Sequence, residues 1–188
     1  MKSIGVVDDD SSIRDVLRGL LEGSDYEVVF ESSDGIGVVD LCMEKEPDAV
    51  IIDVGLPSKD GIELSKEISA TSAIPVVLIT ANREDDILKR AVDCGVMSII
   101  GKPFERADII SSLGFAISRQ EELDDLKREN MELRGSLESR RLIEKAKGFL
   151  MEERSISEDA AFALIRTRSM NERSSMKDVA KALIEELG

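Results

Sequence analysis

Short apolar runs alternate with amphipathic stretches over the first 104 residues, and this alternation restricts the possible folds more than any other feature of the chain. Five of the runs have the length of buried strands. They are IGVV at 4–7, YEVVF at 26–30, AVII at 49–52, PVVLI at 75–79 and MSII at 97–100. The stretches between them place apolar residues at helical spacing, as Ile13, Leu17 and Leu20 illustrate. Strands alternating with helices predict an α/β fold around a five-stranded parallel sheet.

The chain changes character after about Asp108, where strand patterns end and the sequence becomes a nearly continuous helical pattern with no proline beyond Pro103. A seam with alternating spacings of three and four runs through it, as in a coiled coil. Its members are Leu123, Leu126, Asn130, Leu133 and Leu137. In a parallel dimer Asn130 would pair with its symmetry mate and set the register, whereas in a monomer the leucines would pack on the N-terminal domain. The spacing leaves both interpretations open.

Residues 138–188 show three helical patterns, at about 138–153, 158–171 and 175–187. Ser157 is the expected cap of the second pattern, and Ser174 or Ser175 that of the third. The predicted core residues are Leu142, Ile143, Ala146, Phe149, Leu150, Ala161, Phe162, Leu164, Ile165, Met170, Val179, Ala180, Leu183 and Ile184. We therefore predict a domain at 1–116, a coiled-coil linker helix at 117–137 and a small three-helix all-α domain at 138–188.

Composition narrows the class of protein further. No apolar run reaches 18 residues and no cleavable signal pattern is present, so we expect a cytoplasmic protein without membrane contact. Cys42 and Cys94 form no CxxC pair and the chain has no histidine, which disfavours a zinc site and predicts free thiols. The sequence also lacks a Walker loop, a GxGxxG motif and a nucleophile elbow, so no independent enzyme is expected.

Chemically active residues stand at the carboxyl ends of four predicted strands, which meet at one edge of a parallel sheet. They are Asp8, Asp9 and Asp10 after the first strand, Asp53 after the third, Thr80 after the fourth and Lys102 after the fifth. Carboxylates gathered in this way repel one another unless a cation lies among them, and an all-oxygen site favours Mg²⁺. A nucleophilic carboxylate beside a metal ion and a lysine fits phosphoryl transfer.

In this order, the segments VVDDD, IIDVGLPSKDG, LITAN and GKPF resemble the signature of the two-component receiver family, over about residues 1–118. The resemblance implies a doubly wound, flavodoxin-like sheet and a sensor histidine kinase as phosphoryl donor. It assigns the phosphoacceptor to Asp53, the acidic metal pair to Asp8 and Asp9, and a backbone carbonyl ligand of Mg²⁺ to Gly55. It also makes Thr80 and Lys102 the phosphoryl-binding residues, and it implies a cis peptide bond before Pro103.

One position departs from the family pattern. Three residues before the lysine the family usually has Tyr or Phe, whose ring follows the movement of the threonine hydroxyl, but this chain has Ile99. An isoleucine has no ring to move between buried and exposed positions. Phosphorylation is expected to survive this change, while the usual readout through the neighbouring surface is in question.

Charge distinguishes the C-terminal segment from the rest. The whole chain has a net charge of −14, residues 1–118 have −12 and residues 139–188 have +1. A basic face there could follow phosphates or could simply be solvated. Its members are Arg140, Arg141, Lys145, Lys147, Arg154, Arg166, Arg168 and Arg173. Gly148, inside a helical pattern, could be a packing notch or could admit a ligand.

The segment LESRRLIEKAKGFLMEERSISEDAAFALIRTRSM followed by MKDVAKALI resembles the ANTAR domain, an RNA-binding antiterminator module, over about residues 135–187. The resemblance implies binding of stem-loops in a nascent transcript, which would prevent transcription termination. Arg141, Lys145, Lys147 and Arg166 are the expected RNA contacts, with Gly148 permitting close approach.

The leading hypothesis is that phosphorylation of Asp53 favours a homodimer through the coiled coil, so that two ANTAR modules engage a two-hairpin RNA. Two alternatives remain at this point. One is a DNA-binding response regulator, although the last helical segment is short and acidic at its end. The other is a signalling adaptor whose helical tail binds a protein partner, which the negative net charge would suit.

Overall fold

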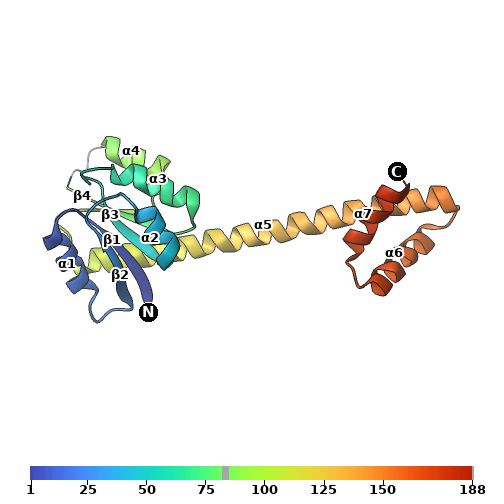
Figure 1. The fold of residues 1–188 in the computed structure, drawn as a ribbon, viewed down its shortest axis with the longest axis horizontal. Helices are drawn as coiled ribbons and strands as arrows, with labels where there is room; N and C mark the ends of the chain where they lie inside the picture. Colours follow the sequence, from blue (N-terminus) through green and yellow to red (C-terminus); the bar gives the residue numbers. More distant parts are fainter. Residues whose placement is uncertain (82–84, 188) are drawn as a thin grey trace. The chain divides into compact units, whose positions relative to one another are not determined.

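The computed structural model describes residues 1–81 and 85–187, which form two compact units, Met1–Asp124 and Asp125–Gly188. The described elements alternate as the sequence predicts and then become purely helical (Figure 1). In chain order they are β1 Lys2–Val7, α1 Ser11–Leu21, β2 Tyr26–Ser32, α2 Val38–Lys45, β3 Ala49–Asp53, α3 Gly61–Thr71, β4 Val76–Thr80, α4 Asp85–Asp93, β5 Ser98–Gly101, α5 Arg106–Arg154, α6 Glu158–Glu172 and α7 Met176–Leu187.

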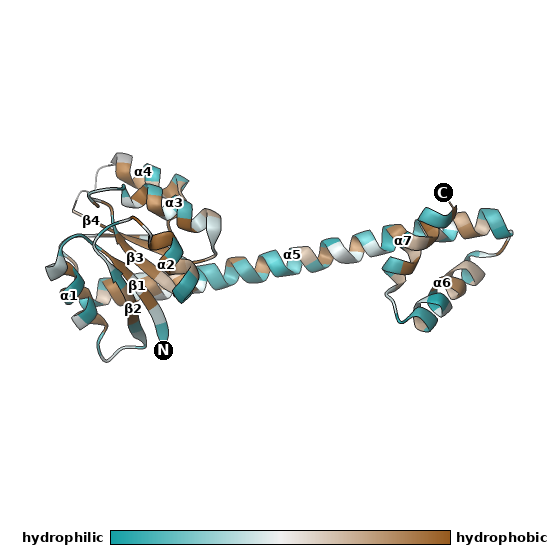
Figure 2. Ribbon diagram, in the orientation of Figure 1, coloured by the Kyte–Doolittle hydropathy of each residue, from teal (hydrophilic) through white to brown (hydrophobic). Residues whose placement is uncertain are grey.

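The N-terminal unit contains one parallel five-stranded sheet in the order β2-β1-β3-β4-β5. This is the strand order of the flavodoxin-like doubly wound fold, so the predicted fold class is confirmed. Every residue of the central strands β3 and β4 is buried, which explains why their sequences are continuous apolar runs. Figure 2 shows these strands as the most hydrophobic part of the unit.

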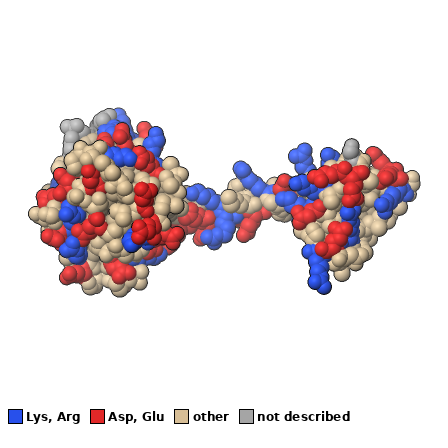
Figure 3. Space-filling model, viewed as in Figure 1, with Lys and Arg blue, Asp and Glu red and all other residues tan. Residues whose placement is uncertain are grey.

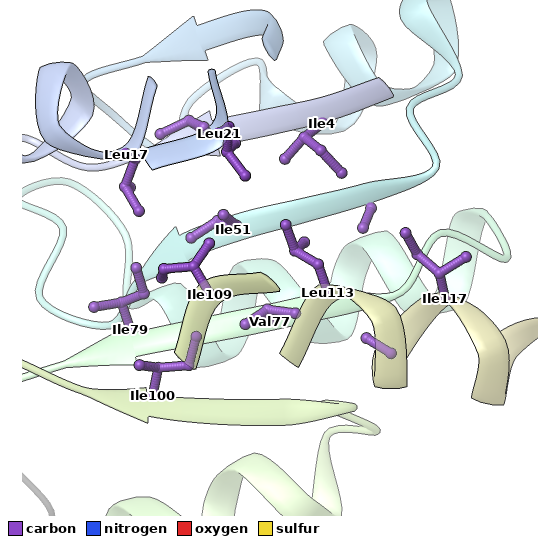
Figure 4. Packing of buried hydrophobic residues seen from close by; sticks show 13 residues of the cluster. Ile4, Leu17, Leu21, Ile51, Val77, Ile79, Ile100, Ile109, Leu113 and Ile117 are labelled. Atoms are coloured by element: carbon purple, nitrogen blue, oxygen red, sulfur yellow. The ribbon is translucent and has the colours of Figure 1, made fainter. Parts of the chain in front are cut away.

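Helices cover both faces of the sheet. Helix α1 and the first three turns of α5 pack on one face, where Leu17, Ile109 and Leu113 are fully buried against the strands (Figure 4). Helices α2, α3 and α4 contribute to the core on the other face, with Ile62 and Ile68 among its buried residues. This two-sided covering buries the sheet and leaves the carboxyl ends of its strands for the site.

Helix α5 runs without interruption from Arg106 to Arg154. It includes the whole predicted linker at 117–137 and the first predicted helix of the C-terminal domain, so no break in helical structure marks position 138. The absence of proline after Pro103 allows this continuity, and the single interior glycine of the linker, Gly135, is tolerated. Three linker leucines are exposed, with Leu126 at 54%, Leu133 at 58% and Leu137 at 66%, while Leu123 is half-buried.

The C-terminal unit builds a small core between the end of α5, α6 and α7. Ser157 caps α6 by accepting a hydrogen bond from the Ala160 N–H, and Ser175 accepts one from the Asp178 N–H at the start of α7. Both predicted caps are therefore confirmed. The buried residues of this core are Ala146, Leu150, Ala161, Ile165, Val179, Ala180 and Leu183, all of them predicted.

Three predicted core residues of α6 are exposed instead. Phe162 is 42% exposed, Leu164 is 41% exposed and Met170 is 70% exposed, so their assignment to the core was wrong. The physical reason is the width of the buried stripe. Ala161 and Ile165 are the buried residues of α6. Phe162 and Leu164 stand one position away from them and Met170 stands five positions away, which places all three on other sides of the helix.

Gly61 offers a test of how tightly the loop after β3 is packed. A Cβ atom at this position would lie 2.2 Å from the carbonyl oxygen of Asp53, so Gly61→Ala should lower the free energy of unfolding by about 1–3 kcal/mol. Gly19 in α1 is the matched control, because a Cβ there meets nothing within 4 Å. Gly19→Ala should raise stability by about 0.5–1 kcal/mol. Urea unfolding of both variants measures the difference, and equal effects would contradict the close approach.

Candidate functional site

The strand ends bring together the residues that the sequence singled out. Asp53 and Thr80 are the last residues of β3 and β4, while Asp8 and Lys102 directly follow β1 and β5. The strands are parallel and adjacent, so all these ends meet at one edge of the sheet. The side chains of Asp8, Asp53 and Thr80 are buried there, unusual surroundings for two carboxylates and a hydroxyl.

Lys102 joins the two buried carboxylates. Its Nζ lies 2.6 Å from Asp53 Oδ1 and 2.9 Å from Asp8 Oδ2. The remaining oxygens accept backbone hydrogen bonds: Asp53 Oδ2 from the Gly55 N–H at 2.6 Å, and Asp8 Oδ1 from the Asp10 N–H at 3.0 Å. Each oxygen of the pair therefore has a donor, and both side chains are held in place.

Burial and charge act differently on the members of this cluster. Burial raises the pKa of the Asp8 carboxyl, although hydrogen bonds from Lys102 and from the Asp10 backbone act against it. Burial alone would lower the pKa of the Lys102 ammonium, but its hydrogen bonds to Asp53 and Asp8 outweigh that effect and raise it. The negative charge of Asp8 is thus only partly compensated, so an additional cation near it would be stabilising.

The donor set fits Mg²⁺ by its chemistry. Two convergent carboxylates are enough for this ion, which keeps several water ligands. The third predicted acidic residue, Asp9, is exposed. Among the described residues, no three His, Cys, Asp or Glu side chains gather closely enough to hold a metal ion. Any metal here would therefore combine the two buried carboxylates with ligands such as water, the Gly55 carbonyl or a reoriented Asp9.

Sequence reasoning missed one residue that shapes the site. Arg14 of α1 donates from Nη1 to the carbonyl oxygen of Asp8 at 2.6 Å, and its Nε lies 3.4 Å from Glu31 Oε2 in β2. Asp10 caps the same helix by accepting from the Ser12 N–H. These contacts fix the turn that carries the acidic residues. A basic residue one turn inside a helix is common on any solvated face, so the pattern contained no distinctive signal.

Ile99 lies in β5 and is partly buried. It lines a surface depression of about 280 Å³ together with Leu88 of α4, Asp108 and Ser111 of α5 and nearby residues of β5. The peptide bond between Lys102 and Pro103 is cis, as the sequence resemblance implied. The last residue of the LITAN segment, Asn82, lies outside the described residues.

In the C-terminal unit, three of the four cations expected to contact RNA are exposed. Arg141 and Lys145 are on α5 and Arg166 is on α6. The Lys145 ammonium lies 5.5 Å from the centre of the Phe149 ring. Gly148 is exposed, and a Cβ atom there would meet nothing within 4 Å, so packing inside this unit does not explain the glycine.

Lys147 differs from the other three. Its side chain is only 8% exposed, and its ammonium pairs with Glu144 at 2.7 Å and with Glu158 at 2.6 Å. These hydrogen bonds raise the pKa of Lys147. Glu158 is the first residue of α6, so this lysine joins the end of α5 to the start of the next helix. The positive charge of Lys147 is therefore balanced by two glutamates of the C-terminal unit itself.

Comparison with known proteins finds one family match in each of the two units. Residues 4–114 match the response regulator receiver domain family and residues 131–184 match the ANTAR domain family, neither of which is a family of enzymes. The transcriptional regulatory protein PdtaR of Mycobacterium tuberculosis is 38% identical over 183 residues, which are 97% of this chain and 89% of PdtaR. The chemotaxis protein CheY of Halobacterium salinarum is 31% identical over 60% of this chain and 93% of its own.

Among solved structures, the signal receiver domain of the putative response regulator NarL from Mycobacterium tuberculosis aligns with a TM-score of 0.58 and 28% identity. That alignment covers 62% of this chain and 96% of the NarL chain. Fold and site thus define a receiver of the two-component type. The chain belongs to the response regulators that carry a receiver domain followed by an ANTAR domain. None of the helices in the described residues is long and apolar enough to cross a membrane.

The raised pKa of Asp8 predicts a gain in stability on removing its charge. The folded state favours protonated Asp8, so its ionised form lowers stability at pH 7, and this penalty disappears as the pH falls below its pKa. Asp8→Asn should therefore raise the free energy of unfolding in Mg²⁺-free buffer at pH 7, by about 1 kcal/mol or less, with a smaller gain in acid. Asp10→Asn is the control, because the Ser12 backbone hydrogen bond lowers the pKa of Asp10. A loss of stability in Asp8→Asn would mean that its ion pair with Lys102 outweighs burial.

Proposed function

We propose that Asp53 accepts a phosphoryl group from a phosphohistidine of a sensor histidine kinase. The observation that carries this proposal is the contact of Lys102 with both Asp53 and Asp8 at the edge of the sheet. One carboxylate oxygen of Asp53 attacks phosphorus, an O–P bond forms and the N–P bond of the donor breaks. Lys102 neutralises charge on the transferred group, and the Thr80 hydroxyl donates to one of its oxygens.

Asp8, Asp9, Asp53 and the backbone carbonyl of Gly55 are the residues that would hold Mg²⁺ in this receiver. The bound ion would supply positive charge that screens the carboxylates from the incoming phosphoryl group. The chain itself keeps Asp53 ready for attack, since Gly55 fixes one carboxylate oxygen and Lys102 fixes the other. Arg14 holds the turn of Asp8 so that the acidic pair stays near the acceptor.

Replacing the acceptor tests this assignment. Asp53→Asn removes the nucleophilic carboxylate, so phosphorylation by acetyl phosphate and Mg²⁺ should fall to background in a Phos-tag gel or mass spectrum. Asp48 lies just before the other end of the same strand, with its carboxylate accepting from the Ser3 N–H. Asp48→Asn should therefore leave phosphorylation unchanged. Undiminished labelling of Asp53→Asn would refute the acceptor assignment.

We further propose that the three-helix domain predicted at 138–188, within the C-terminal unit, binds stem-loops in nascent RNA and thereby prevents transcription termination. The match of residues 131–184 to the ANTAR family supports this, as do the exposed cations Arg141, Lys145 and Arg166. Gly148 would let an RNA backbone approach α5 closely. Lys147 would contribute indirectly, by holding α6 against α5.

A homodimer through residues 117–137 is the proposed link between the two activities. Leu126, Leu133 and Leu137 are exposed in the single chain, which supports pairing with a second copy over packing on the receiver. Asn130 is exposed within the same seam and would hydrogen-bond its symmetry mate. Phosphorylation would shift the equilibrium between monomer and dimer.

Beryllofluoride, a mimic of the phosphoryl group, tests this link. With beryllofluoride and Mg²⁺ the mass from light scattering should double, and affinity for a two-hairpin RNA should rise in the same samples. A Leu126→Lys, Leu133→Lys variant should stay monomeric and show no rise, because charges at both seam positions disfavour pairing. A protein that is already dimeric, with RNA affinity unaffected by beryllofluoride, would contradict the mechanism.

A further inference from the structure

Helix α6 presents a stripe of side chains that the core of the C-terminal unit does not use. Phe162, Arg166 and Met170 follow one another at four-residue spacing, so they lie along one side of the helix. Phe162 is 42% exposed, Met170 is 70% exposed, and Arg166 between them is exposed as well. The buried side of the helix, formed by Ala161 and Ile165, is a separate stripe.

The surroundings of this stripe have unusual charge for this protein. The chain contains 39 acidic and 25 basic residues, yet residues 160–171 of α6 contain two arginines and no acidic residue. Figure 3 shows mainly uncharged side chains along α6, at the edge of the C-terminal unit. The stretch itself therefore offers no carboxylate that would repel an anionic ligand, and Glu158, one turn before Phe162, is paired with Lys147.

Arg166 is available to such a ligand, while neighbouring cations are not. Lys147 pairs with Glu144 and Glu158, and Arg168 pairs with Glu172 and Glu186. Within the part of the chain that the structure describes, no ion pair involves Arg166. Its guanidinium can therefore bind a phosphate without first giving up a carboxylate partner.

We propose that Phe162 and Met170 stack against unpaired bases of an RNA loop while Arg166 binds a phosphate between them. This inference rests on the RNA-binding function proposed above and adds a base-contacting surface to it. Unpaired loop bases expose flat faces that aromatic rings cover, whereas paired bases in a stem do not. The small exposed side chains Ala163 and Thr167 beside the stripe leave room for the bases.

A loop of RNA suits this stripe better than a protein surface or a duplex. Arg166 separates the two apolar side chains, so the stripe alternates flat apolar contacts with a cation, and a single strand alternates bases with phosphates in the same way. A partner helix would instead favour a continuous apolar stripe. A duplex would require a basic surface but would leave the Phe162 ring without a stacking partner.

The test uses the full-length protein with beryllofluoride and Mg²⁺, and hairpin RNAs with a constant stem and a randomised loop. Hairpins selected by the wild-type protein are then measured with variants by fluorescence anisotropy. Phe162→Ala should weaken binding about 5-fold to 150-fold, the range expected for loss of one stacked base. Phe162→Tyr should bind nearly as well as wild type, and Phe162→Leu, which keeps volume but loses the ring, should not.

Leu164 is the matched control. It is 41% exposed on the same helix but lies on another side of it, two positions beyond Phe162. Leu164→Ala should leave affinity unchanged. Arg166→Ala should reduce the dependence of log affinity on log salt concentration by about 0.7, as expected for one phosphate contact on a single strand. Phe162→Ala should leave that salt dependence unchanged.

The outcomes separate this inference from the function on which it rests. If the wild-type protein selects no hairpin, the proposed RNA function fails and the stripe has no role in it. If the wild-type protein selects hairpins but Phe162→Ala or Phe162→Leu binds them as tightly as the wild type does, RNA binding stands and the stacking surface is refuted. Equal losses in Phe162→Ala and Leu164→Ala would also refute it, since they would indicate a general disturbance of α6.

Discussion

Asp8 and Asp53 are buried carboxylates at the ends of neighbouring strands, and the Lys102 ammonium that touches both is the interaction on which the receiver site depends. Two buried like charges are unfavourable without a cation. The lysine can reach them only because β5 ends at the same edge of the sheet as β1 and β3. The strand order therefore brings these opposite charges together at one edge of the sheet, which helices cover on both faces.

The second constraint is the length of α5, which belongs to both units of the chain. Its first turns complete the core under the sheet, its middle is mostly hydrophilic (Figure 2), and its last turns form part of the C-terminal core. Helix α5 is continuous from Arg106 to Arg154, so both cores contain residues of the same helix. The residues of the proposed dimer seam lie in this helix, between the segments that enter the two cores.

Much of the site could be predicted from the sequence, because strand ends and chemically active residues coincide in it. Asp53, Thr80 and Lys102 follow apolar runs, and parallel topology brings such residues together. Arg14 and Lys147 could not be predicted as structural contacts. Each depends on a partner that only folding brings near, a backbone carbonyl for Arg14 and the first residue of the next helix for Lys147. Phe162 shows the opposite error, since hydrophobicity suggested burial that the narrow contact of α6 does not provide.

The sequence by itself determined the fold class, the order of the elements, the helix cap at Ser157 and the family of each domain, and it narrowed the cap of the last helix to Ser174 or Ser175. These follow from local periodicity, from side chains next to their own backbone and from motifs at fixed spacing. Tertiary structure decided which cations are free and which apolar side chains are exposed. Lys147 and Arg166 are both basic residues within helical patterns of the sequence. In the structure Lys147 is buried between two glutamates, whereas Arg166 is exposed. Ion pairing and burial depend on distances between helices, and these distances cannot be derived from the spacing of residues along one helix.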